Sequence, residues 1–129
     1  MSIASDLITY IKAQQSTITS ILEDGFGTTT NQVMARSDPS TANVREFVDG
    51  SYAGKQQITF YARNTSPSAA QAVLNLIRST VDKKEISLTA LQVLRVTAVS
   101  TVSFVSKETT GEFIYSTTVD VDFDGKNPY

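Results

Sequence analysis

The chain has 129 residues, a formal net charge of −2 and a pI near 5.0. This length predicts one domain, residues 1–129, that is large enough to bury a hydrophobic core. The charge disfavours a free basic module for nucleic acid or an anionic membrane. The absence of cysteine and histidine excludes thiol nucleophiles, Ser-His-Asp triads, disulfides and zinc sites that use those ligands.

Sequence motifs for nucleotide binding are also missing. Neither the P-loop pattern nor the dinucleotide-binding G-x-G-x-x-G occurs. The N-terminal sequence "MSIASDLITY" has no basic region or cleavage-site pattern, and no apolar run is long enough to cross a membrane. We therefore expect a protein that is made in the cytoplasm, is not an enzyme and uses no cofactor or metal.

The first expected element is an amphipathic helix over residues 3–22. Gly25, just past its last apolar position, fits a helix stop. A short strand follows at 32–36, and the turn-rich sequence "SDPSTAN" at 37–43 predicts a loop. The apolar positions of the helix are Leu7, Ile8, Ile11, Ile18, Ile21 and Leu22.

Residues 44–64 have the layout of a hairpin, with glycines in the connection between two alternating arms. The second arm is "KQQITFYARN", and its apolar face consists of Ile58, Phe60 and Ala62. The opposite face carries large side chains, among them Tyr61 and Arg63, that are suited to a contact.

A second helix is predicted with clear boundaries. Ser66 can cap it, Pro67 suits its first position, and Lys83 and Lys84 close it near the negative end of the helix dipole. Its apolar stripe consists of Ala70, Val73, Leu74, Ile77 and Val81.

Two strands end the chain. Residues 91–105 predict one long strand with Val96 and Phe104 on its core face, and its other valines suggest partial cover on both sides. After a hairpin loop at 106–111, residues 112–124 alternate again, with the acidic residues on the face away from the core. The whole predicts an α+β fold in which two helices pack on one face of a mainly antiparallel four- to five-stranded sheet.

The acidic end of this last strand resembles the first half of an EF-hand calcium loop, with oxygens at Asp120, Asp122 and Asp124 and a glycine at Gly125. The twelfth loop position would fall beyond Tyr129, and the preceding residues alternate as in a strand. We therefore expect no specific calcium site here.

The sequence "REFVDGSYAGK" at 45–55 mixes charge, aromatic residues and glycine. It fits a hairpin turn with Phe47 in the core equally well as a loop that contacts another protein, since Tyr, Phe and Arg are enriched in interfaces. The candidate interface residues are Phe47, Tyr52, Lys55, Tyr61 and Arg63.

The order of residues 48–82, "VDGSYAGKQQITFYARNTSPSAAQAVLNLIRSTVD", resembles the tail terminator (minor capsid) proteins of long-tailed bacteriophages. Those proteins similarly pass from an aromatic, glycine-containing loop through a strand into a helix, and end with two long strands. The resemblance implies a structural virion protein of the tail or neck, present in the host cytoplasm during assembly. It implies a hexameric ring that caps the tail tube and joins it to the head.

The implied partners are further copies of the chain, the major tail tube protein and a head-completion or connector protein. DNA would pass through the ring without specific binding, past a channel face formed by Asp120, Asp122 and Asp124, because like charge discourages adhesion. Two alternatives stay open: a neck or head-completion connector, and a monomeric module that binds a peptide or small ligand on its sheet. A hydrolase that uses carboxylates such as Glu46 ranks last.

Overall fold

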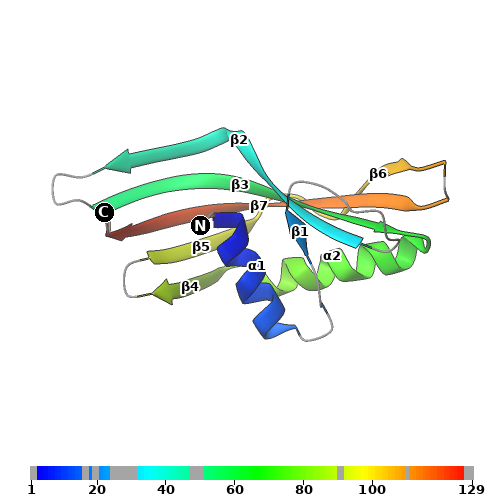
Figure 1. The fold of residues 1–129 in the computed structure, drawn as a ribbon, viewed down its shortest axis with the longest axis horizontal. Coiled ribbons are helices and arrows are strands. Elements are labelled where there is room, and N and C mark those ends of the chain that lie inside the picture. Colours follow the sequence, from blue (N-terminus) through cyan, green and yellow to red (C-terminus); the bar gives the residue numbers. More distant parts are fainter. Residues whose placement is uncertain are drawn as a thin grey trace.

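The computed structural model describes residues 3–15, 18, 21–23, 32–46, 51–89, 92–109 and 111–126. Side chains are described at 7–15, 18, 21–22, 32–36, 56–85, 95–109 and 111–122. The elements in chain order are α1 (Ile3–Gln14), β1 (Leu22–Glu23), β2 (Gln32–Glu46), β3 (Ser51–Asn64), α2 (Pro67–Val81), β4 (Lys84–Thr89), β5 (Gln92–Ala98), β6 (Ser103–Lys107) and β7 (Phe113–Lys126). They form an elongated molecule, with long strands along its main axis (Figure 1).

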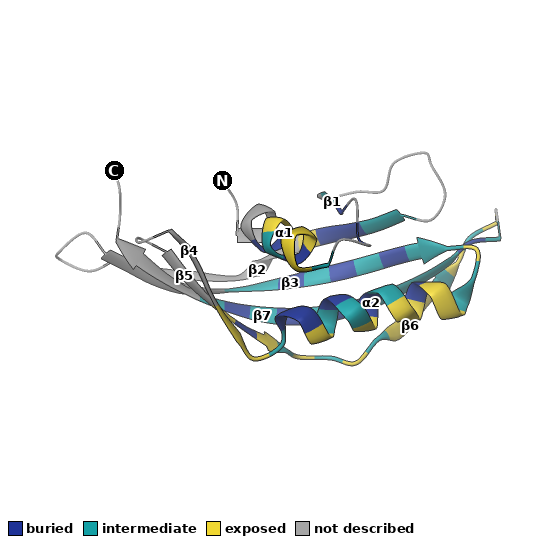
Figure 2. Ribbon diagram, turned by 90° about the horizontal axis from the view of Figure 1, so that it is seen from below, coloured by how far each residue is buried: buried dark blue, intermediate teal, exposed yellow. Residues whose placement is uncertain are grey.

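The strands form one sheet in the order β1-β2-β3-β7-β5-β4, with β6 paired to β7 beside β5. All pairs are antiparallel except β1 with β2. Both helices lie against the same face of the sheet (Figure 2). The α+β class and this one-sided packing are confirmed, while the described sheet has seven strands, more than the four or five expected.

Helix α2 follows its sequence signals closely. The Ser66 Oγ accepts a hydrogen bond from the backbone N–H of Ala69 at 3.4 Å, and Pro67 occupies the first turn. Leu74 and Ile77 of the predicted stripe are fully buried. The two lysines lie just outside the helix. Lys83 has a φ of 59° and donates its backbone N–H to the Val96 carbonyl at 2.8 Å, and Lys84 begins β4.

Helix α1 is shorter than the expected 3–22, since it ends at Gln14. The sequence that follows, "STITS" at 16–20, is rich in Ser, Thr and a β-branched residue, which favour other backbone conformations over helix. Ile18 and Ile21 are nevertheless buried, and Leu22 opens β1. The predicted stop at Gly25 lies outside the described residues.

Two further boundaries differ from the sequence prediction. The expected loop at 37–43 lies within β2, where the pairing with β3 shifts register between Asp38 and Asn43. An irregular strand therefore accommodates Pro39 and its polar neighbours without ending. The strand β4 was not predicted, because its sequence continues the polar end of α2 without a clear break.

The predicted long strand at 91–105 is divided into β5 and β6. Val96 on β5 is buried as expected, whereas Phe104 on β6 is 57% exposed, so its assignment to the core was wrong. Val99 and Val105 are exposed as well, so the expected cover on both sides is absent there.

The core lies between the helices and the sheet. Among the residues predicted to form it, Leu22 and Val73 are only partly buried. The buried apolar residues include Leu7, Ile11, Ile18, Ile58, Phe60, Leu74, Ile77, Val96, Val119 and Val121.

Candidate contact surfaces

The face of the sheet that the helices leave uncovered is called the open face. Side chains alternate along a strand, so burial of Ile58 and Phe60 under the helices places Gln57, Thr59 and Tyr61 on this open face. All three are partly exposed. The register adds neighbours from β2 and β7, so the open face is a broad surface of mostly polar side chains.

At one end of the open face, Arg63 makes an intramolecular ion pair. Its Nε lies 3.4 Å from the Glu112 Oε2, and its Nη2 donates to the Gln32 Oε1 at 3.0 Å. The side chains of Arg63 and Glu112 are only 13% and 7% exposed. The guanidinium group therefore already has partners within the subunit. The substitution Arg63→Glu, which reverses the charge, is expected to damage the fold. The sequence suggested Arg63 as a contact residue for another copy, but the partners that the structure shows for it lie within the same chain.

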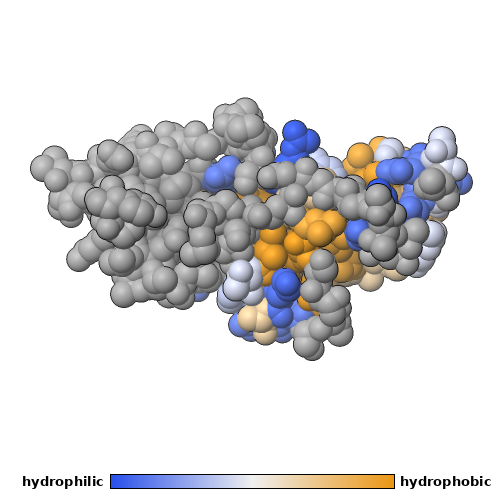
Figure 3. Space-filling model, viewed as in Figure 1, coloured by the Kyte–Doolittle hydropathy of each residue, from blue (hydrophilic) through white to orange (hydrophobic). Residues whose placement is uncertain are grey.

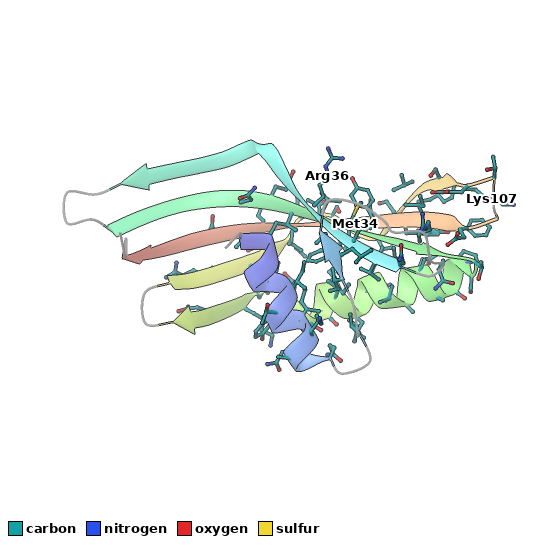
Figure 4. The ribbon with its side chains drawn as sticks, viewed as in Figure 1. Met34, Arg36 and Lys107 are labelled. Atoms are coloured by element: carbon teal, nitrogen blue, oxygen red, sulfur yellow. The ribbon has the colours of Figure 1, made fainter. Side chains whose placement is uncertain are left out.

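Tyr61 has a different setting. The register places it between Met34 of β2 and Ser116 of β7, and its side chain remains partly exposed. Arg36, two residues along from Met34, is exposed and projects from β2 (Figure 4). Tyr61 thus remains available for an outside contact, unlike Arg63.

The acidic residues of β7 lie among basic and amide neighbours. Asp120 accepts a hydrogen bond from the Gln57 Nε2 at 3.4 Å. The register places Asp122 between Lys55 and Arg95, and the Arg95 Nε lies 3.9 Å from the Glu85 Oε2. Among the described side chains, charges of opposite sign thus alternate from Glu85 on β4 through Arg95 on β5 to Asp122 on β7, so this row is not purely acidic.

Several predicted residues lie outside the described side chains. Phe47 is not among the described residues, and only the backbone is described at Tyr52, Lys55 and Asp124. Tyr52 pairs with Glu46 and Gly125 across the sheet. Their part in an interface, and the absence of calcium at 120–125, stay predictions. The backbone at 120–125 is a strand, not the loop that an EF-hand requires.

The clearest exposed apolar surface among the described residues is the segment 99–105, which connects β5 to β6 and includes most of β6. Val99, Phe104 and Val105 are 52%, 57% and 46% exposed. Figure 3 shows a small apolar area at the β6 end of the molecule, apart from the larger one near β1. The Phe104 ring meets the Tyr115 ring edge to face, with 5.6 Å between their centroids.

Ser100 fixes the direction of this segment. Its carbonyl oxygen accepts hydrogen bonds from the Thr117 Oγ1 at 3.1 Å and the Arg78 Nε at 3.2 Å. Its Oγ accepts the Thr118 backbone N–H at 3.0 Å. Ser100 thereby joins the connection between β5 and β6 to both β7 and α2. This set of hydrogen bonds is called the Ser100 latch. It also provides a hydrogen-bond acceptor for the hydroxyl group of Thr117, whose side chain is buried.

The described residues show little that points to chemistry. They contain no group of three or more potential metal ligands, and none of their helices is long and apolar enough to cross a membrane. Comparison of the sequence with models of known protein families and with curated proteins finds no match.

Sequence reasoning identified Tyr61 as a contact candidate but missed the segment 99–105. An alternating pattern marks a strand face without showing which element covers it. A weak signal was present, since residues 96–106 contain no charged side chain although the chain has 24. Depletion of charge together with an aromatic residue is a composition typical of interface centres.

Proposed function

We propose that the protein is a tail terminator: a virion assembly protein whose copies form a ring that caps the tail tube and joins it to the head connector. The resemblance of residues 48–82 to such proteins gives the proposal its identity. The α+β fold with a one-sided helix layer is compatible with it. In this proposal the protein acts through contact surfaces, without catalytic groups.

One observation carries the assembly role. Phe104 and Val105 are large apolar side chains, exposed on a strand that the Ser100 latch holds in place. Exposed apolar residues on an ordered element are typical of surfaces that a partner covers. In addition, Tyr61 on the open face provides a second residue type that interfaces favour.

The charge row through Asp122 changes one detail of the expectation. Because the register places Arg95 beside Asp122, the negative charge of this part of β7 is partly offset. Repulsion of DNA by Asp120 and Asp122 alone is therefore weak support for a channel face. The proposal does not depend on it.

The test is to follow assembly of particles with and without the protein. If it is a terminator, its loss should give tails of irregular length that fail to join heads, and electron microscopy measures both. A connector of the neck should instead leave tail length normal while tails and heads stay apart. Normal particles without the protein would contradict both roles.

A separate measurement addresses the monomeric binding module. Light scattering coupled to size-exclusion chromatography gives the mass of the purified chain, alone and with isolated tail tubes. A ring protein should assemble in at least one of these conditions. A chain that stays monomeric in both would favour the binding module.

A further inference from the structure

We infer that β6 of one copy pairs edge to edge with β2 of a neighbouring copy, so that the sheet continues from subunit to subunit. The inference rests on the proposed ring and names its contact. It starts from two strand edges that the described sheet leaves without a neighbouring strand, those of β6 and of β2; β4, at the end of the strand order, has a third such edge.

The first edge is β6. Within the described chain, β7 is its only strand partner. The backbone N–H and C=O groups on the other side of β6 therefore have no strand beside them. The natural complement of such a row is another strand edge, because each edge offers donors and acceptors in alternation.

The second edge belongs to β2. The strand β1 pairs with β2 only at Met34 and Ala35. From Arg36 onward, the described part of the chain therefore places a strand on one side of β2 only. Figure 4 labels Arg36 on β2 and Lys107 on β6, which mark the two edges to be joined.

These two edges differ, and the difference determines the kind of assembly. A β6–β6 contact would be isologous and would stop at a dimer. A contact between β6 and β2 is heterologous, so each copy keeps one free edge for the next. Strand twist rotates each added copy relative to the last, and the series closes as a ring when the rotations complete a turn.

The side chains of β6 limit where pairing can occur. Ser103, Phe104 and Val105 are exposed and uncharged, whereas Lys107 places a charge at the end of the strand. The pairing with β7 shifts register between Phe104 and Ser106. A terminal lysine and an irregularity protect a strand edge from indiscriminate pairing. We therefore assign the backbone pairing to Ser103 and Phe104, before the irregularity at Val105, and the exposed Val105 side chain packs beside the new strand pair.

Cysteine cross-linking tests the two edges directly, since the chain has no cysteine of its own. Ser103→Cys and Arg36→Cys are placed in the same chain, at exposed positions, and treated with a short bis-maleimide. The double variant should give a ladder of covalent oligomers. A mixture of the two single variants should stop at dimers, and each single variant alone should give none.

Two results of that experiment would overturn the inference. Dimers from Ser103→Cys alone would indicate a β6–β6 contact. Absence of a ladder from the double variant, under conditions where the uncross-linked protein forms rings, would show that the ring uses other surfaces.

A charge introduced at the edge supplies the second test. Val105→Lys should fold, because Val105 is 46% exposed, but it should weaken assembly about tenfold or more, since a lysine would be buried against the neighbouring strand. The matched control is Gln71→Lys, which adds the same charge at an exposed position of α2. Light scattering measures assembly, and a thermal melt checks the fold.

The outcomes separate this inference from the proposed function. Rings from the wild type and from Val105→Lys alike would reject the edge contact while leaving the terminator role standing. A wild-type chain that stays monomeric, alone and with tail tubes, would contradict both. Loss of assembly in Val105→Lys with retention in Gln71→Lys would support the inference.

Discussion

Val96 and Phe104 occupy equivalent positions in one alternating sequence pattern, yet Val96 is 1% exposed and Phe104 is 57% exposed. The difference follows from what lies over each strand. Helix α2 packs on β3, β7 and β5, and β6 lies beyond that cover. The pattern thus predicts a strand face, while the path of the helix decides whether that face becomes core or contact surface.

The covered region should be most sensitive at Leu74, which is fully buried in α2. Leu74→Ala is expected to lower the free energy of unfolding by about 2 to 5 kcal/mol, because it removes apolar contacts and leaves a cavity. Urea denaturation measures the change. Gln71→Ala, on the exposed side of the same helix, is the control and should change stability little.

The ion pair of Arg63 and Glu112 should come next. Glu112→Ala leaves the mostly buried guanidinium without its carboxylate and is expected to cost about 2 to 3 kcal/mol. The double variant Arg63→Ala with Glu112→Ala should lose less than the sum of the single changes. Strict additivity in urea denaturation would show that the pair contributes no coupling.

Truncation of Val96 and of Phe104 to alanine tests whether their difference in burial leads to a difference in stability. Val96→Ala should cost about 2 kcal/mol, through lost burial and a small cavity. Phe104→Ala should cost only about 1 kcal/mol, mostly from the contact with Tyr115, although it removes many more atoms. A larger loss at Phe104 than at Val96 in thermal or urea denaturation would contradict the assigned exposures.

The smallest effect is expected in the charge row. Asp122→Asn should change the free energy of unfolding by less than about 0.5 to 1 kcal/mol, since partly exposed pairs contribute little. The effect should shrink further in high salt because the charges are screened. A loss unaffected by salt would indicate a packing role instead.

Elements with strong local signals could be predicted from the sequence. The cap at Ser66, Pro67 in the first turn and a regular apolar stripe locate α2 almost to the residue. A hairpin loop was also predicted at 106–111; β6 continues to Lys107, so the turn begins after it, and Gly111 adopts a φ of 91°, which suits glycine. In these cases the determining interactions lie within a few residues of one another.

Other features depend on distant partners and could not be predicted. Gln15 of the segment after α1 donates to the Thr80 Oγ1 of α2, a contact that no local pattern indicates. The division of 91–105 depends on Ser100 finding partners on β7 and α2. The same holds for the contact candidates. The sequence could not show that Arg63 has partners within the subunit while the Tyr61 side chain is partly exposed.

The Ser100 latch has a mechanical consequence. A pull on β6 would pass through the Ser100 carbonyl to Arg78 on α2 and to Thr117 on β7 at the same time. Because two elements share this load, the edge strand should resist displacement more than a free hairpin of its length. Any force that a neighbouring copy exerts on β6 would therefore be transmitted to the C-terminal turn of α2, where Arg78 lies.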